Sequence, residues 1–170
     1  MAMIYRGRCW KFGDDVLNDG HIMDIEQVKA KQTDPAVLAR YCMIGLDPTF
    51  AGKAKPHDII VAGKNFGTGQ LHMQGPLALK GLGLAVVSES MTRSFYRLMI
   101  TAGVPMLSFV PGVTRTVESG DELEVDFQGG IVRNLTRGTT TEGEPLAGFL
   151  LDIIAAGGEL GWIKKQRAAA

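Results

Sequence analysis

A glycine-rich segment between an apolar run and a helix start is the part of the sequence best suited to chemistry. Gly63, Gly67 and Gly69 follow the apolar, β-branched run 58–62, and Pro76 then opens a predicted helix. A strand, a glycine-rich loop and a helix start expose several backbone N–H groups at the positive end of the helix, which suits an anion. The alternative is a tight connection that uses glycine only for its backbone dihedral angles.

The same loop carries a side chain that could transfer a proton. His72 can act as an acid, a base or an anion-binding group, because the pKa of a histidine is ordinarily about 6.5. The alternative is a solvated loop histidine. Arg93 and Arg97 are spaced to share one helix face, where they either reach an anion or lie in solvent.

Charge and hydropathy exclude several partners. The 170 residues include 18 Lys and Arg against 18 Asp and Glu, so no net charge attracts nucleic acid or an acidic membrane. No stretch reaches the roughly 20 apolar residues of a membrane-spanning helix. The first residues lack the apolar run of a signal peptide. We therefore expect a cytoplasmic protein with no nucleic-acid or membrane partner.

Metal-ligand spacing is missing from the sequence. Cys9 and Cys42 stand alone and are expected to be reduced thiols. Asp14, Asp15 and Asp19 share a polar turn, but their spacing does not match an EF-hand loop and no terminal glutamate follows. We expect neither a metal nor a cofactor on this chain.

The elements around the glycine-rich loop predict an α/β protein. Apolar runs at 84–88 and 106–110 are expected to be strands, and 91–102 a helix capped by Ser90. Strand, loop, helix, strand, helix, strand is the order of a parallel sheet. Before the loop, 33–43 predicts a helix whose cap is a threonine or an aspartate.

The last third of the chain changes character. Strict alternation at 122–127, a glycine pair, and the run 131–135 predict a β-hairpin. The polar segment 136–144 is expected to loop out. A helix is expected at 146–156, with Phe149 on its buried side. No second domain boundary is visible.

Several segments together resemble the small subunit of 3-isopropylmalate dehydratase, the swivel domain of the aconitase family. These segments are Trp10–Val16, Asp58–Gly67, Ser90–Arg97, Gly120–Asp126 and Ile153–Gly158. The resemblance implies a single swivelling β/β/α domain over residues 1–170, with a partly parallel sheet or barrel and flanking helices. It also implies a hydro-lyase of leucine biosynthesis, a small hydroxy di- or tricarboxylic acid as substrate, and a large-subunit partner that carries a 4Fe-4S cluster.

The resemblance breaks down inside the glycine-rich loop. The family reads Gly-x-Gly-Ser-Ser-Arg-Glu-His, whereas this chain reads Gly-Thr-Gly-Gln-Leu-His-Met-Gln at 67–74. Gln70 replaces the serine that abstracts a proton in the family, and an amide cannot act as a base. Leu71 and His72 replace a serine and an arginine that bind carboxylate. Near the N-terminus, Asn18-Asp19 still resembles the family's Thr-Asp pair.

The predicted site follows from this comparison. We expect His72 and Gln70 in the catalytic positions. The expected substrate-binding residues are Gly67, Thr68, Gly69, Leu71, Asp19 and Asn65.

Three functions remain open on the sequence. The chain is either a small subunit of an active hydro-lyase, for isopropylmalate or another hydroxy-acid, or a catalytically silent subunit for assembly or regulation. The third is a free-standing module that binds a small acid. A large subunit encoded beside this chain would favour the first two.

Overall fold

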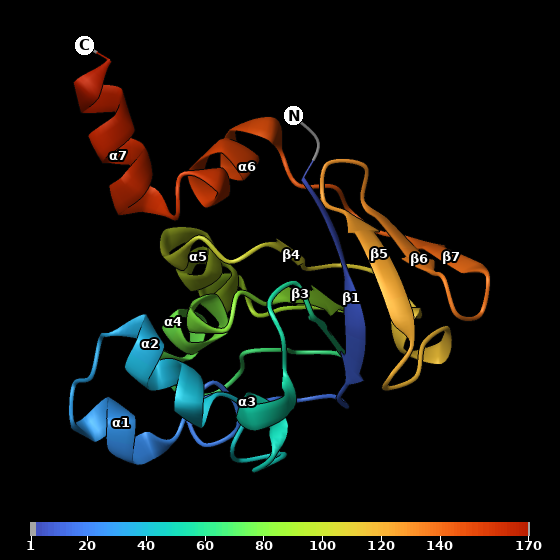
Figure 1. Cartoon of the computed structure of the whole chain (residues 1–170), viewed down its shortest axis with the longest axis horizontal. Coiled ribbons are helices and arrows are strands. Elements are labelled where there is room, and N and C mark those ends of the chain that lie inside the picture. The colour runs from blue at the N-terminus through green and yellow to red at the C-terminus, as the bar shows by residue number, and fades with distance from the viewer. Residues whose placement is uncertain (1–2, 170) are drawn as a thin grey trace.

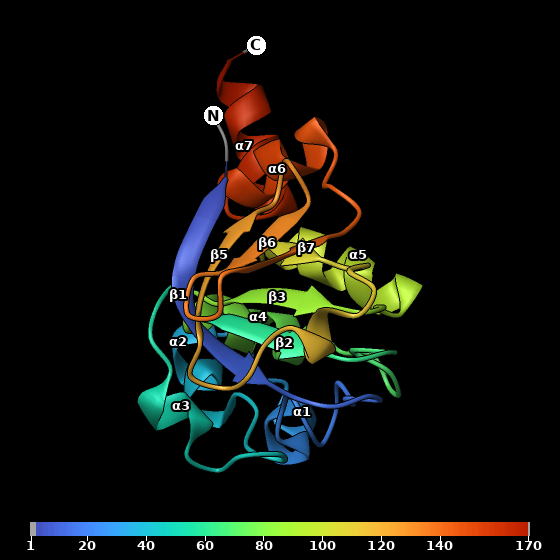
Figure 2. The same cartoon turned by 90° about the vertical axis from the view of Figure 1, so that its right-hand side faces the viewer.

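The computed structural model describes residues 3–169, which fold around one curled sheet of seven strands in the order β4-β3-β2-β1-β5-β6-β7 (Figures 1 and 2). The strands are β1 (Ile4–Lys11), β2 (Ile59–Ala62), β3 (Ala85–Ser88), β4 (Met106–Leu107), β5 (Glu122–Asp126), β6 (Ile131–Asn134) and β7 (Thr139–Glu142). The α-helices are α1 (Ile25–Lys29), α2 (Pro35–Leu38), α3 (Phe50–Lys53), α4 (Gln74–Gly81), α5 (Arg93–Ala102), α6 (Gly148–Ala155) and α7 (Glu159–Ala168). The predicted α/β class is confirmed.

The parallel half of the sheet carries the glycine-rich loop. Strands β1, β2, β3 and β4 pair in parallel, and α4 and α5 make the crossovers between β2, β3 and β4. Every residue of β2 and β3 is buried, which explains their unbroken apolar sequences. The predicted strand-loop-helix order is confirmed, although β4 is shorter than the predicted run 106–110.

Strand β1 joins the two halves of the sheet. Its residues 4–8 pair antiparallel with β5, whereas residues 9–11 pair in parallel with β2. The strand therefore passes from one neighbour to the other along its length. In Figure 1, β5, β6 and β7 lie on one side of β1, and α4 and α5 lie on the other.

The antiparallel half contains the predicted hairpin and one strand that was not predicted. Strands β5 and β6 pair antiparallel on either side of the glycine pair, with Asp126 opposite Ile131, so the predicted hairpin is confirmed. The prediction that 136–144 loops out is wrong, because Thr139–Glu142 forms β7 and pairs antiparallel with β6. An edge strand with one face in solvent needs little apolar sequence.

Helix termini were predicted in part. Asp34 caps α2 by accepting a hydrogen bond from Ala36 N, as expected. The helix is shorter than predicted, since a 3-10 turn replaces it from Ala39. Ser90 as the cap of α5 is wrong: the helix begins at Arg93, and Ser90 Oγ instead accepts a hydrogen bond from Asn65 N.

The C-terminal helices depart most from expectation. Phe149 is 65% exposed, so its predicted burial in the helix 146–156 is wrong. Ile153 and Ile154 are buried as expected, and Leu151 is the third buried residue of α6. Helix α7 was not predicted, and it stands beside α6 at the end of the molecule opposite α1 and α3 (Figure 1).

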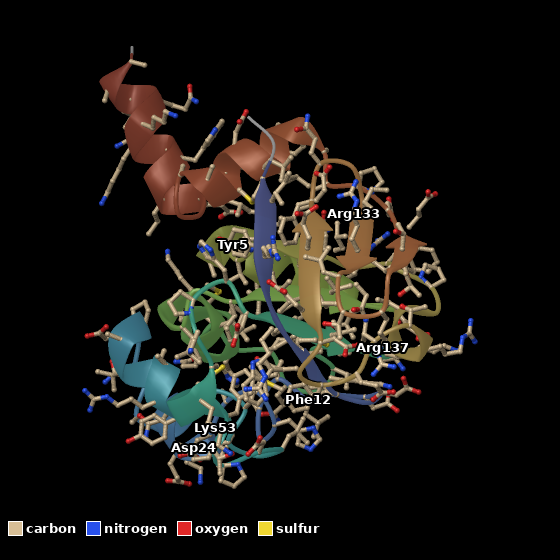
Figure 3. The ribbon with its side chains drawn as sticks, turned by 45° about the vertical axis from the view of Figure 1, so that its right-hand side comes forward. Tyr5, Phe12, Asp24, Lys53, Arg133 and Arg137 are labelled. Atoms are coloured by element: carbon tan, nitrogen blue, oxygen red, sulfur yellow. The ribbon has the colours of Figure 1, made fainter. Side chains whose placement is uncertain are left out.

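One continuous apolar core lies between the sheet and its helices. A buried carboxylate braces it near the start of β2, where Asp58 accepts hydrogen bonds from Trp10 Nε1 at 2.9 Å and from the Arg8 and Lys55 amides. Figure 3 shows Arg133 and Arg137 on the β6 and β7 side of the molecule, with Asp24 and Lys53 at the α1 and α3 end.

Candidate functional site

The glycine-rich loop leaves the carboxyl end of β2, the edge of a parallel sheet where ligands commonly bind. Its backbone turns sharply, because Asn65, Gly67 and Gly69 have positive φ angles of 58°, 76° and 84°. Gly67 lies directly on a buried aromatic ring, and a Cβ added there would lie 2.1 Å from Phe95 Cγ. Glycine is therefore required at 67 by both its dihedral angle and its packing.

A segment that follows β1 holds the first half of the loop. Lys64 N donates to Asp14 Oδ1 at 2.7 Å, and Asn65 Nδ2 donates to Asp15 Oδ1 at 2.8 Å. The amides of Gly67 and Thr68 both donate to the carbonyl of Val16, at 2.9 and 3.2 Å. The segment Asp14–Val16, called the bracing segment below, thus holds the loop in place. The Gly67 and Thr68 amides are already hydrogen-bonded to it and are not free to bind a ligand.

The second half of the loop brings two predicted site residues together. His72 Nδ1 lies 2.6 Å from Asp19 Oδ2, although the residues are 53 positions apart in the sequence. The Asp19 side chain is 7% exposed, whereas that of His72 is 45% exposed. An ionised carboxylate only accepts hydrogen bonds, so Nδ1 carries the hydrogen and Nε2 is left to exchange a proton.

The remaining predicted residues take different places. Gln70 and Leu71 are exposed beside His72, and Gly69 precedes them on the same exposed stretch. From Gly69 to Met73, the backbone N–H groups make no hydrogen bond within residues 3–169. Asn65 stands apart from His72 and bonds to the bracing segment instead. The structure therefore brings Gly69 to His72 together with Asp19. Asn65 instead connects the loop to the bracing segment.

Asn18 contacts the site, although the sequence did not identify it as a site residue. It is fully buried, and its Nδ2 donates to the His72 carbonyl at 2.9 Å and to the Gln70 carbonyl at 3.3 Å. The same nitrogen lies 3.2 Å from Asp19 Oδ1. The only signal in the sequence was its place next to Asp19 in the pair that resembles the family's Thr-Asp.

The thiols are poor candidates for metal binding. Cys9 and Cys42 are fully buried, and burial raises the pKa of the Cys9 thiol to about 12 and raises that of Cys42 as well. Residues 3–169 contain no group of three or more histidine, cysteine, aspartate or glutamate side chains that could hold a metal ion. No helix in the same range is long and apolar enough to span a membrane.

Comparison with known proteins finds full-length relatives, although no family model matches the chain. The chain is 47% identical over 165 residues to the 3-isopropylmalate dehydratase small subunit of Pyrobaculum calidifontis. The matched region covers 96% of this chain and 99% of that protein. It is 43% identical over 169 residues to the isopropylmalate/citramalate isomerase small subunit of Methanocaldococcus jannaschii, with coverage of 99% and 98%. A crystal structure of 3-isopropylmalate dehydratase from the latter organism matches with a TM-score of 0.88 at 36% identity, over 98% of this chain and 97% of that chain.

Proposed function

Because the chain belongs to the family of 3-isopropylmalate dehydratase small subunits, we propose that it is the small subunit of a cytoplasmic hydro-lyase of this type. The enzyme would dehydrate and rehydrate a branched 2- or 3-hydroxy diacid in leucine biosynthesis. Residues 1–170 would act as one swivelling domain that closes over the site of a separate large subunit.

The 4Fe-4S cluster belongs on that large subunit in this proposal. A 4Fe-4S cluster is held by several cysteine thiolates gathered around it. The sequence has only two cysteines, Cys9 and Cys42, and residues 3–169 contain no group of three or more histidine, cysteine, aspartate or glutamate side chains that could hold a metal ion. The chain therefore contributes acid–base and anion-binding groups rather than the cluster.

The contact between His72 and Asp19 is the observation that carries the chemistry. Dehydration breaks a C–H bond, the electron pair forms the new double bond, and the hydroxyl leaves the neighbouring carbon and takes up a proton to become water. His72 Nε2 would accept the proton, while Asp19 stabilises the charged ring through Nδ1 at 2.6 Å. In the hydration direction the same nitrogen returns the proton. Asp19 is shielded from water, which strengthens its effect on the ring.

The exposed loop backbone would bind one substrate carboxylate. The N–H groups of Gly69, Gln70 and Leu71 have no partner among the described residues, and they precede the positive end of α4. The Gln70 side chain adds a donor to the same stretch. Gly67 and Thr68 would shape the site through their backbone, because their amides already bond to Val16.

A catalytically silent subunit for assembly or regulation is the second candidate. Gln70 and Leu71 favour it, because an amide is no base and a leucine side chain offers an anion no hydrogen bond. Both side chains are exposed on the loop. Packing therefore does not require a glutamine or a leucine there, and a side chain that binds anions more strongly would fit.

Reconstitution separates the two candidates. The chain is purified anaerobically with a large subunit of the same enzyme family from the same organism, and dehydration of 3-isopropylmalate is followed by the ultraviolet absorbance of the alkene. Turnover supports the active hydro-lyase. A complex that forms but turns over neither 3-isopropylmalate nor a panel of related hydroxy diacids would favour the silent subunit.

A further inference from the structure

The main-chain carbonyl of His72 cannot be satisfied by the helix that follows it. In an α-helix each N–H donates to the carbonyl four residues earlier, so the carbonyl of residue 72 would need the N–H of residue 76. Residue 76 is Pro76, which has no N–H. The first bond of α4 accordingly runs from Leu77 N to Met73 O, one residue further along.

Asn18 supplies the missing donor from a distant part of the chain. Its Nδ2 donates to the His72 carbonyl at 2.9 Å and to the Gln70 carbonyl at 3.3 Å. Within residues 3–169, these two carbonyls receive no other hydrogen bond. The backbone of Asn18 holds the same region, because its N–H donates to the Thr68 carbonyl at 2.9 Å.

Asn18 also contacts the carboxylate that pairs with His72. Its Nδ2 lies 3.2 Å from Asp19 Oδ1, while Asp19 Oδ2 bonds to the imidazole. Two hydrogens on Nδ2 therefore serve three acceptors, so at least one hydrogen is shared. One buried amide thus fixes both the backbone of His72 and the carboxylate that faces its ring.

The position of Asn18 is itself fixed by packing. The side chain is fully buried, and a Cβ added to Gly75 would lie 2.0 Å from Asn18 Oδ1. That oxygen has no hydrogen-bond partner among the described residues. A buried acceptor without a partner costs free energy, so the contacts of Nδ2 are what justify an asparagine here.

We propose that Asn18 is a positioning residue that holds His72 against Asp19. The inference rests on the proposed function, because it assigns Asn18 to the acid–base pair of that site. Asn18 touches only the loop backbone and Asp19, so it acts through His72 rather than on the substrate.

The test replaces the amide with a side chain of similar size that cannot donate. Asn18→Leu removes both hydrogens of Nδ2, and Asn18→Thr keeps one hydroxyl donor should the leucine variant fail to fold. In the full chain with ¹⁵N label, the neutral His72 ring is expected to carry its hydrogen on Nδ1, where it faces Asp19. The variants should shift that ring toward the Nε2–H form and speed the exchange of the Leu77 amide, which bonds to the Met73 carbonyl at the start of α4, by about tenfold or more, more strongly for leucine than for threonine.

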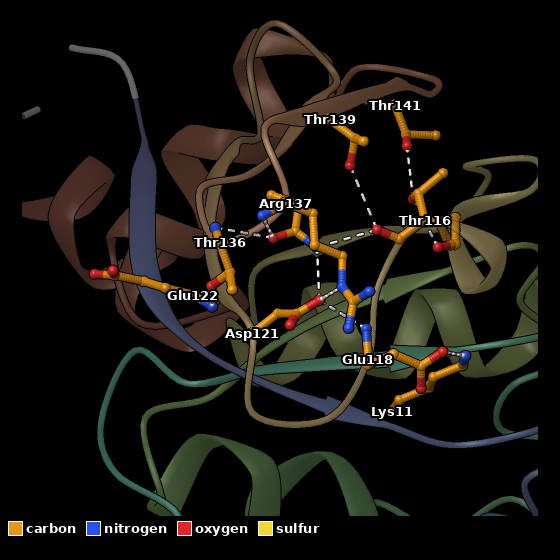
Figure 4. Close-up of polar contacts among 11 residues, drawn as sticks. Lys11, Thr116, Glu118, Asp121, Glu122, Thr136, Arg137, Thr139 and Thr141 are labelled. Carbon is orange, nitrogen blue, oxygen red and sulfur yellow. Dashed lines mark hydrogen bonds and ion pairs between the residues drawn. The ribbon is translucent and has the colours of Figure 1, made fainter.

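Asn134 provides a matched control. It is also buried, and its Nδ2 donates to one carbonyl, that of Thr116 at 3.0 Å, and to one carboxylate oxygen of Asp121 at 2.7 Å. Its partners lie in a separate network beside Arg137 (Figure 4). Asn134→Leu should lower stability while leaving the His72 ring and the exchange of the Leu77 amide at wild-type values.

Turnover of the reconstituted enzyme completes the test. The inference is supported if Asn18→Leu loses turnover by at least about tenfold and also shows the changed ring signal. Asn134→Leu should keep wild-type turnover. An unchanged ring signal in both Asn18 variants overturns it, as does full turnover with a changed ring signal. A wild-type complex without activity on any hydroxy diacid contradicts the proposed function, whereas the ring and exchange measurements still decide whether Asn18 holds His72.

Discussion

Replacing Gly67 with alanine should be far more damaging than the same change at another glycine of similar backbone angle. Gly67 has a φ of 76°, and an added Cβ would lie 2.1 Å from Phe95 Cγ. Phe95 is fully buried and packs edge-on against Phe66 at a centroid distance of 5.6 Å. The ring therefore has little room to move away from a new methyl group.

Two costs combine at this position. A left-handed backbone costs a residue with a Cβ about 1–2 kcal/mol, and forcing a methyl group into a packed core costs about 1–3 kcal/mol. We expect Gly67→Ala to lower the free energy of unfolding by about 2–5 kcal/mol. For a chain of this length, that corresponds to a fall in Tm of roughly 4–20 °C.

Gly138→Ala is the matched control, because Gly138 has a φ of 68° and nothing lies within 4 Å of its added Cβ. Gly138→Ala should lower the free energy of unfolding only by the backbone cost of about 1–2 kcal/mol. Urea unfolding of both variants measures the difference, and Phe95→Leu combined with Gly67→Ala should recover part of it. Equal losses for Gly67→Ala and Gly138→Ala would refute the steric reasoning.

Two further predictions concern titrating groups. Cys9 and Cys42 should resist alkylation at pH 8 in the native protein and react on unfolding, because burial raises both thiol pKa values, that of Cys9 to about 12; rapid native labelling would contradict this. The Arg137 guanidinium, 2.6 Å away, holds the pKa of Asp121 at about 2, below its usual 3.8. The resulting stability is full above pH about 4 and lost as pH falls toward about 2. Asp121→Asn should flatten this part of the pH-dependence of unfolding free energy, and an unchanged slope would count against it.

Sequence patterns predicted the parallel half of the fold because burial on both faces leaves a clear record. Strands β2 and β3 are wholly buried, and their unbroken apolar sequences predict this burial. Strand β7 was missed because its sequence is Thr-Thr-Thr-Glu, and an edge strand held by β6 needs no apolar alternation. The error at Phe149 has a similar origin, since helical spacing identifies a face but not what covers it.

The full-length relatives confirm the family resemblance, which rested on several short segments in the right order. The candidate site was only partly predictable. Residue types identified His72 and Asp19 separately, but their contact joins segments 53 residues apart and depends on the fold. The role of Asn18 is further removed from sequence, because it arises from a proline that cannot donate to the His72 carbonyl.

The central claim is that His72 transfers the proton in a hydro-lyase reaction. The measurement that tests it most directly is the rate of alkene formation by reconstituted enzyme containing His72→Ala, beside His57→Asn as control. His57 precedes the N-terminal end of β2, whereas the glycine-rich loop follows its C-terminal end, and the His57 ring packs against Tyr5. We predict a loss of at least about 100-fold for His72→Ala and wild-type turnover for His57→Asn. Wild-type turnover in His72→Ala would contradict the claim.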